Sequence, residues 1–276
     1  MAHMFNAEGE KLLDKELKVL DKGFIRLVDY YGSDARIVQS ARVSYGEGTK
    51  TSREDKGLID YLLRNEHTSP FEQVVFTFHC KMPIFVARQW IRHRTARLNE
   101  ISGRYSIMKE EFYVPASENV SYQSTNNKQG RSTDEVPSEL REEVLRILTE
   151  SGKSSYSEYQ KLVDKGIARE LARVCLPLSL YTEWYWQIDL HNLLHFLKLR
   201  LDAHAQYEIR EYAVAMADVV KKICPYTWES FEEHTLHGVR LSRTEASLLK
   251  AIIKNENIDK NIKAYQSLIS KLPYLE

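Results

Sequence analysis

The sequence predicts an α+β fold, in which a mixed or antiparallel central sheet is flanked by helices. The clearest observation is a strand from Val74 to Met82, in which apolar and polar side chains alternate. A second alternating run, LSLYTEWYWQI, begins at Leu178. Strands and helices are interleaved, but the long crossovers do not repeat as βαβ units, which favours α+β over a doubly wound parallel sheet.

Local sequence patterns predict the other strands and helices in the first half of the chain. The segment 24–32 (FIRLVDYYG) is typical of a strand, and the helix after it begins with Ser33 or the next residue as its cap. A second helix is predicted over 53–65. Pro83 stands at a favoured first helical position, so the strong strand is expected to lead directly into a helix that ends at Arg94.

The second half begins with a polar segment, 117–137, which is predicted to be a surface loop. A long helix is expected over 138–165, interrupted or bent near Gly152 and stopped by Gly166. After a short helix and the second alternating strand, Asp189 is well placed to cap a further helix.

The last third reads as helical. Apolar residues at helical intervals run from 205 to 224 and stop at Pro225, and a Ser-x-x-Glu capping box at Ser242 begins another helix. One more helix finishes the chain. We therefore expect a single domain over 5–237 and a helical C-terminal extension over 238–276.

The charge balance limits the classes of partner. The chain has 276 residues, with 39 basic and 39 acidic side chains, and this neutrality argues against holding nucleic acid or a membrane surface by bulk charge. No apolar run approaches the roughly 20 residues that span a bilayer. Three cysteines, Cys80, Cys175 and Cys224, are too few for a disulfide framework. We expect a cytoplasmic protein.

The strongest anomaly is a cluster of arginines. The segment 88–104 (RQWIRHRTARLNEISGR) holds five arginines, one histidine and a single acid, Glu100. No glycine-rich phosphate loop is present, so arginines would have to bind any phosphate. Cations at the end of a helix favour its dipole, which is the structural alternative. Convergence on a polyanion explains the cluster better, because a guanidinium binds phosphate oxygens in pairs.

A second cluster lies about one hundred residues further along. Arg200 follows apolar positions of a helix and is either half of a buried ion pair, with Glu208 or Asp202, or a ligand-binding group. His191 and His195 are one helical turn apart, which is a spacing that metal ligands use.

Two other classes of protein remain open from these residues alone. One is a metal-dependent hydrolase built on His191, His195 and Asp202. The other is a single-stranded RNA binder that uses the arginine cluster with three aromatic residues as stacking platforms. Those residues are Trp90, Tyr105 and Tyr113.

The arginine segment closely resembles the signature of the flavin-dependent thymidylate synthases, in which Arg92, His93 and Arg94 are followed after seven residues by Ser102. Similar segments occur in the same order elsewhere. They are ARVSYG at Ala41, HTSPFEQVVFTFHCKMPIFVARQW at His67, LARVCLPLSLYTEWYW at Leu171 and LRLDAHAQYEIREYA at Leu199. The resemblance covers about 22–228. Two positions depart from it, because many relatives carry Ser at Arg97 and Asn at His195.

The resemblance implies an activity and its co-substrates. This family methylates dUMP to dTMP, with the methylene group of 5,10-methylenetetrahydrofolate and a hydride from FAD that NADPH has reduced. Tetrahydrofolate is the expected by-product. No cysteine nucleophile is expected, since Cys80 and Cys175 are interpreted as packing residues. A homotetramer with sites shared between chains is also implied.

The resemblance also implies roles for individual residues. Arg200 is the expected catalytic residue, because a guanidinium against the O2/N3 edge of uracil would stabilise negative charge on the ring. The expected dUMP-binding residues are Gln89, Arg92, Glu100, Ser102, Gly103, Arg104, Arg173 and Arg200. The expected FAD-binding residues are Ser69, Arg92, His93, Arg94, Glu100, Asp189, His191 and His195. His67 and Tyr105 are candidates for the flavin and folate face, and no metal is expected.

Overall fold

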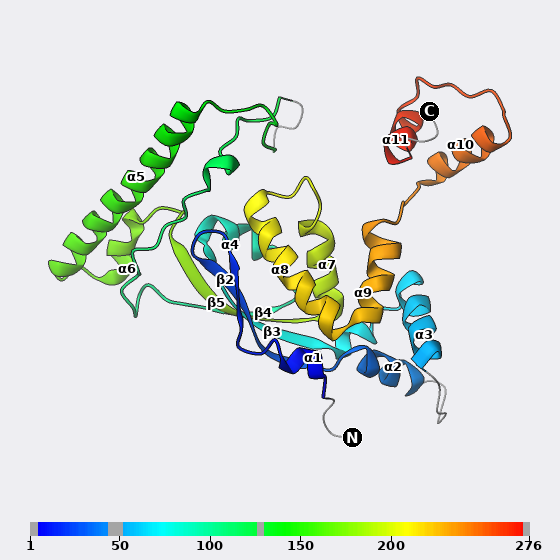
Figure 1. Ribbon diagram of the computed structural model, residues 1–276, viewed down its shortest axis with the longest axis horizontal. Coiled ribbons are helices and arrows are strands. Elements are labelled where there is room, and N and C mark those ends of the chain that lie inside the picture. Colours follow the sequence, from blue (N-terminus) through cyan, green and yellow to red (C-terminus); the bar gives the residue numbers. More distant parts are fainter. Residues whose placement is uncertain (1–4, 44–51, 126–129, 273–276) are drawn as a thin grey trace. The chain divides into compact units, whose positions relative to one another are not determined.

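A five-stranded sheet lies at the centre of the fold (Figure 1). The computed structural model describes residues 5–43, 52–125 and 130–272. The strand order is β1-β2-β3-β5-β4, and every neighbouring pair is antiparallel, so the predicted α+β class is confirmed. The strands are β1 Glu16–Val19, β2 Gly23–Tyr31, β3 Val75–Pro83, β4 Arg97–Glu100 and β5 Tyr181–Asp189.

Helices make up most of the remaining described chain. The α-helices are α1 Ala7–Glu10, α2 Asp34–Arg42, α3 Ser52–Arg64, α4 Ile84–Trp90, α5 Ser138–Asp164, α6 Arg169–Ala172, α7 Leu190–Arg200, α8 Tyr207–Ile223, α9 Pro225–Phe231, α10 Arg243–Ile253 and α11 Lys263–Lys271. Single turns are η2 Phe71–Gln73, η3 Ser117–Asn119, η4 Arg173–Cys175 and η5 Glu232–Leu236. None of the described helices has the length and apolar character that a membrane span requires.

The chain divides into two compact units, Met1–Trp228 and Glu229–Glu276. The first unit contains the sheet and the second contains α10 and α11. The division between a single domain over 5–237 and a helical extension over 238–276 stays a prediction.

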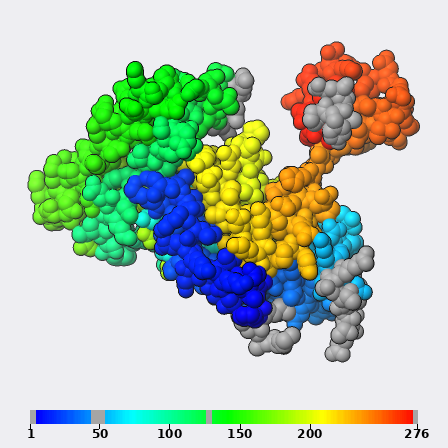
Figure 2. Space-filling view, viewed as in Figure 1, coloured from blue at the N-terminus to red at the C-terminus, as the bar shows by residue number. Residues whose placement is uncertain are grey.

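The main core lies between one face of the sheet and the helices α7 and α8 (Figure 1). The alternating side chains of β3 on this face, from Phe76 to Met82, are fully buried, as the sequence predicts. In β5, Trp184 and Trp186 lie on the same face and pair in register with Cys80 and Phe78. Helix α8, yellow in Figure 2, also contacts β1 and α1, which are blue.

One tryptophan joins the sheet to both covering helices. The Trp90 ring lies 5.4 Å and 5.3 Å from the rings of Trp184 and Trp186, centroid to centroid. It also lies 5.2 Å from Phe196 of α7 and 5.6 Å from Tyr212 of α8. Because aromatic packing of this kind leaves little freedom, it fixes the end of α4, where the arginine segment begins.

All three predicted N-cap positions are confirmed, and two of them carry a side-chain cap bond. Asp189 Oδ1 accepts a hydrogen bond from the Asn192 backbone N–H at 2.9 Å and fixes the start of α7. The capping box at Ser242 is also present. Ser33 precedes α2 but makes no side-chain cap bond. The next residue, Asp34, is instead buried and accepts hydrogen bonds from the Thr227 amide and hydroxyl, so it ties α2 to the first turn of α9.

The helix predicted to run to Arg94 ends earlier, at Trp90. The chain then turns and forms β4, a strand that the sequence does not predict. Arg97 of β4 pairs in register with Gln187 of β5, 90 positions away in the sequence. A short, polar edge strand carries no apolar alternation, so only this long-range pairing defines it.

The predicted interruption of the long helix near Gly152 is wrong, because α5 is continuous over Ser138–Asp164, and the alternative of a bend there stays a prediction. Gly152 is buried, and a Cβ atom there would lie 2.9 Å from Cγ of Phe112. The glycine therefore permits close approach of α5 to the chain before it. Gly166 has φ +78° and stops the helix as predicted.

The described parts of the predicted loop, 117–125 and 130–137, contain a single 3₁₀ turn and an isolated bridge between Gln123 and Arg131. The loop prediction is confirmed for these residues. The ARVSYG segment continues into residues 44–46, which lie outside the described ranges.

Candidate functional site

The last residue of α7, Arg200, meets the chain that follows α4. The half-buried guanidinium donates from Nε to His93 Nε2 at 3.1 Å. Its Nη2 lies 3.5 Å from the backbone oxygen of Gln89. The His93 ring is 6.0 Å from the ring of His195 on α7. Four predicted site residues, from the end of α4, the turn after it and α7, are thus brought together.

His93 is uncharged in this arrangement. Burial lowers its pKa to about 4, and the positive charge of Arg200 and the neighbouring His195 act in the same direction. Because a guanidinium can only donate, His93 Nε2 must accept, and the proton of the neutral ring resides on Nδ1. Burial also lowers the pKa of Arg200.

The neutral His93 makes the free energy of unfolding depend on pH. Its folded pKa of about 4 lies below the ordinary value of 6.5, so the unfolded chain takes up a proton first as the pH falls. We expect the free energy of unfolding to fall between pH 6.5 and pH 4, by up to about 3 kcal/mol from this residue. Urea unfolding of His93→Gln should show a weaker pH dependence over this range than the wild type. Equal slopes for the two proteins would contradict the assignment.

The ion-pair alternative for Arg200 is wrong. Glu208 is paired with Arg131, and Asp202 lies 2.8 Å from His204 Nδ1. Within the described residues, Arg200 has no carboxylate partner. A half-buried guanidinium with unused N–H groups favours the other alternative, a group that binds a ligand.

A second group forms around Gly103. A Cβ atom on this buried glycine would lie 3.1 Å from Met108 Sδ and 3.2 Å from Arg173 Cδ, so glycine permits η4 to approach. Ser102 Oγ accepts from the Arg104 amide at 3.3 Å. The turn that holds three predicted dUMP-binding residues therefore packs beside a fourth, Arg173.

Glu100 occupies the end of β4, before this turn. Its Oε1 accepts a hydrogen bond from the Thr182 hydroxyl at 2.6 Å, so the carboxylate is held against β5. Arg97, the departure from the family pattern, is exposed and lies 3.4 Å from Gln187 Oε1.

A third group lies where β3 begins and β5 ends. Asp189 pairs in register with Val75, and η2 contacts α7. Ser69 is exposed in the turn before η2, and His191 is on the first turn of α7. His67 is exposed and packs edge-on against Tyr61, with ring centroids 5.8 Å apart.

Arg92 and Arg94 lie beyond the end of α4, and both are exposed. Neither is paired with a carboxylate in the described part of the chain. Only Arg88 of this segment lies in the last turn of α4, so the helix dipole by itself does not account for the whole cluster. Two unpaired guanidinium groups beside the neutral His93 suit an anionic ligand.

Two aromatic residues of the RNA-binding alternative are unsuitable as stacking platforms. Trp90 is fully buried and Tyr113 is 8% exposed, whereas Tyr105 is 75% exposed. The metal-hydrolase alternative also lacks support, since no group of three His, Cys, Asp or Glu residues among those described could hold a metal ion.

Gln206 is a site neighbour that the sequence does not indicate, and the partner of Glu208 is Arg131 rather than Arg200. Gln206 bonds to both Gln89 and Glu208. One signal was available, because Glu208 shares the apolar stripe of its helix with Tyr212 and Met216. An acid on such a stripe must find partners in the interior.

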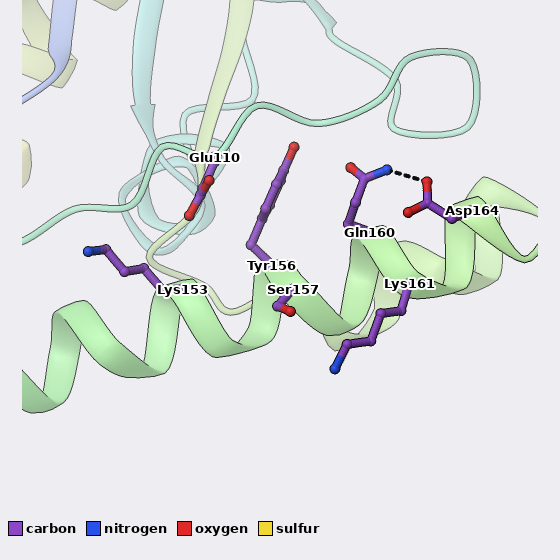
Figure 3. A pocket seen from close by; sticks show the side chains of 7 residues that line it. All are labelled: Glu110, Lys153, Tyr156, Ser157, Gln160, Lys161 and Asp164. Carbon is purple, nitrogen blue, oxygen red and sulfur yellow. Dashed lines mark hydrogen bonds between the residues drawn. The ribbon is translucent and has the colours of Figure 1, made fainter.

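A separate pocket lies along α5 (Figure 3). It contains no predicted site residue. Gln160 donates to Asp164 at 2.8 Å and Lys161 pairs with Glu158 at 2.6 Å, so much of its polar lining is satisfied within the helix. The lining residues are Glu110, Lys153, Tyr156, Ser157, Gln160, Lys161 and Asp164.

The fold and these groups define an α+β protein in which Arg92, Arg94 and Arg200, at the ends of α4 and α7, have no carboxylate partner among the described residues. The model of the family described as thymidylate synthase complementing protein matches residues 26–226. The chain belongs to this family, which confirms the resemblance found in the sequence.

Relatives and solved structures agree with this family assignment. The chain is 66% identical to a flavin-dependent thymidylate synthase of Treponema denticola, over 89% of this chain and 92% of the relative. It is 59% identical to one of Thermus thermophilus, over 88% of each chain. A UMP/dUMP methylase from Streptomyces cacaoi, solved bound with 5-Br UMP, superposes with a TM-score of 0.71 at 34% identity. That match covers 80% of this chain and 98% of the methylase.

Proposed function

We propose that this chain methylates dUMP to dTMP. The relatives named flavin-dependent thymidylate synthase and the methylases solved with 5-Br UMP and 5-Br dUMP support this activity. The observation that carries the proposal is the half-buried Arg200 guanidinium, which His93 holds in place and which no carboxylate of the described residues neutralises.

The methyl group would form from a methylene group and a hydride. The proposed methylene donor is 5,10-methylenetetrahydrofolate, and tetrahydrofolate is released. FAD, after reduction by NADPH, supplies the hydride when it is bound. The C5–H of uracil leaves as a proton, so each new methyl group replaces one C5 hydrogen.

Residues of the Arg200 and Gly103 groups would bind the nucleotide. Arg200 would face the O2/N3 edge and stabilise negative charge that develops on the ring. Its geometry is preorganised by the hydrogen bond to His93. Gln89, Arg92, Glu100, Ser102, Gly103, Arg104 and Arg173 would hold the phosphate, sugar and base.

The residues present fit an FAD pyrophosphate, because Arg92 and Arg94 are exposed and have no carboxylate partner among the described residues. Neutral His93 avoids a third adjacent charge. Ser69, Glu100, Asp189, His191 and His195 would complete the binding site. His67 and Tyr105 would lie on the flavin and folate face.

A homotetramer with shared sites is part of the proposal. Large apolar side chains in the chain segment around Arg173 are exposed in the single chain, namely Leu171 at 63%, Val174 at 74% and Leu178 at 63%. Apolar surface next to a ligand site is typical of a subunit interface. The cytoplasmic location stays a prediction.

The cysteines support a mechanism without a thiol nucleophile, with one correction. Cys80 and Cys224 are fully buried, and burial raises the pKa of both thiols. The interpretation of Cys175 as a packing residue is wrong, because it is exposed on η4. Of the three, Cys175 alone could reach a substrate.

We therefore expect Cys175→Ala to keep most of the methylation rate, and the triple replacement of Cys80, Cys175 and Cys224 to keep it also with lower stability. The measurement is turnover of the folded, FAD-loaded variants. Loss of turnover in Cys175→Ala, with flavin still bound, would refute the cysteine-free mechanism.

The experiment that tests the proposed function is tritium release from C5-labelled dUMP. We expect release that requires FAD, NADPH and methylenetetrahydrofolate together. Omission of each component in turn gives the controls. A folded, flavin-loaded protein that releases no tritium would contradict the proposal.

A further inference from the structure

A hydrophobic cluster beside α5 holds the chain segment that follows the Gly103 turn. Tyr159 of α5 is fully buried in this cluster, and Met108 is 8% exposed. Helix α5 also contacts α6 and η4. No residue of α5 is a predicted site residue, so the proposed function leaves the role of this long helix open. The buried members of the cluster are Met108, Phe112, Tyr159, Ala172 and Leu180.

Two tyrosines of α5 hold the backbone of Met108. The Met108 amide donates to the Tyr159 hydroxyl at 3.1 Å, and the Tyr156 hydroxyl donates to the Met108 carbonyl oxygen at 3.0 Å. Both hydroxyls reach the same residue because side chains three positions apart lie on one face of a helix. Figure 3 shows the Tyr156 side chain extending away from α5 on the side that faces Glu110. The position of Met108 is therefore set by α5.

Met108 in turn packs against the Gly103 turn. A Cβ atom on Gly103 would lie 3.1 Å from Met108 Sδ and 3.2 Å from Arg173 Cδ, so both side chains contact the glycine closely. The three neighbouring residues 102–104 and Arg173 are expected to bind the same nucleotide. Met108 thus lies between α5 and the place where the turn after β4 meets η4.

Helix α6 contacts the same segment, but at the surface. Arg169 Nη1 donates to the Tyr105 backbone oxygen at 2.7 Å, and Arg104 Nε lies 3.1 Å from Glu170 Oε2. Exposed ion pairs contribute little, because water competes for both groups. The Tyr159 bond is buried, and a buried amide that loses its partner has no water to replace it. Tyr159 is therefore the strongest restraint on this segment.

We propose that Tyr159 is a positioning residue for dUMP, which sets the spacing between the turn 102–104 and Arg173 through Met108. The inference rests on the proposed function, in which these residues bind dUMP. They come from two distant parts of the sequence and must contact one ligand together. The affinity therefore depends on how well their geometry is fixed before the ligand arrives.

Tyr159→Phe removes the hydroxyl and keeps the ring. The dissociation constant of dUMP is measured by calorimetry on the FAD-loaded, full-length protein, and KM and kcat are measured by tritium release. We expect the dissociation constant and KM to rise about three- to tenfold, with kcat within about twofold and FAD content unchanged. The rate at saturation is kept because Arg200 and His93, which hold each other, lie on other elements.

A double-mutant cycle tests the route through Met108. Met108→Ala removes the side chain that contacts Gly103, and it should weaken dUMP by a similar factor. The double variant with Tyr159→Phe should weaken dUMP by less than the product of the two factors, because both changes interrupt the same route. A full product would contradict action through Met108.

Tyr30→Phe is the matched control. Tyr30 of β2 is also buried, and its hydroxyl donates to Glu10 Oε1 at 2.6 Å. This variant loses a buried tyrosine hydroxyl far from the predicted site residues in the sequence. We expect lower stability in urea for both variants, but an unchanged dissociation constant of dUMP in Tyr30→Phe. An equal rise in the two variants would show that Tyr159 acts only through overall stability.

The outcomes separate this inference from the proposed function. An unchanged dissociation constant in folded Tyr159→Phe, or a loss confined to kcat, would overturn the inference alone. A wild type that binds no dUMP would overturn the proposed function and the inference with it. If Tyr159→Phe fails to fold, Tyr156→Phe decides the question by the same measurements, with an expected rise of about threefold.

Discussion

Replacing Arg200 by lysine is expected to lower the rate of dUMP methylation by about 10²- to 10³-fold while FAD remains bound. The guanidinium can donate to His93 and to a pyrimidine edge at the same time, since its N–H groups point in fixed directions. A lysine ammonium is a point charge and cannot form this fork. Tritium release under saturating dUMP, together with the flavin absorbance of the purified variant, measures both properties.

Arg146→Lys is the matched control for this change. Arg146 lies on the exposed side of α5, paired with Glu150 at 2.9 Å. The same substitution there should leave tritium release within about twofold of the wild type, because exposed helix pairs contribute little. Full activity of Arg200→Lys would contradict the role in ring activation.

Gly23→Ala is expected to destabilise the protein by about 3 kcal/mol or more. A Cβ atom on Gly23 would lie 2.7 Å from the backbone oxygen of Val19 and 2.8 Å from that of Lys81, and it would collide with the Tyr212 hydroxyl. That hydroxyl donates a buried hydrogen bond of 2.6 Å to Lys81. The new methyl group must therefore displace strand backbone or break the bond between α8 and β3.

Urea unfolding and the yield of soluble protein measure the effect, and Gly57→Ala is the control. Gly57 lies within α3, where an added Cβ meets nothing within 4 Å. Alanine there should stabilise the protein by about 0.5–1 kcal/mol, because glycine is the poorer helix former. If Gly23→Ala unfolds at the same urea concentration as the wild type, the packing around Gly23 is not as tight as the distances require.

Much of the fold could be predicted because its signals are local. The alternation of β3 and β5 and the cap at Asp189 each depend on residues that are neighbours in the sequence. The site motifs were found for the same reason, since 88–104 concentrates its arginines in one short segment. What these patterns could not supply was the partner of each side chain.

Arg200 illustrates the difference. Its sequence context left an ion pair and a ligand-binding role equally open. His93, its partner, is 107 positions away and comes within 3.1 Å only because the ends of α4 and α7 meet around Trp90. For Cys175 the prediction from the sequence was wrong. Its apolar neighbours in the sequence predicted burial, but the thiol is exposed.

The sequence by itself determined the family, the α+β class, the main strands and helices, and the residues of the arginine segment, because periodicity, caps and motifs are properties of contiguous residues. The tertiary structure alone decided that β4 forms at the sheet edge, that Gly23 and Gly152 permit close packing, and that Gln206 links Gln89 to Glu208. These features depend on which distant groups meet once the chain is folded, and hydrogen-bond direction and steric contact exist only between groups that have met.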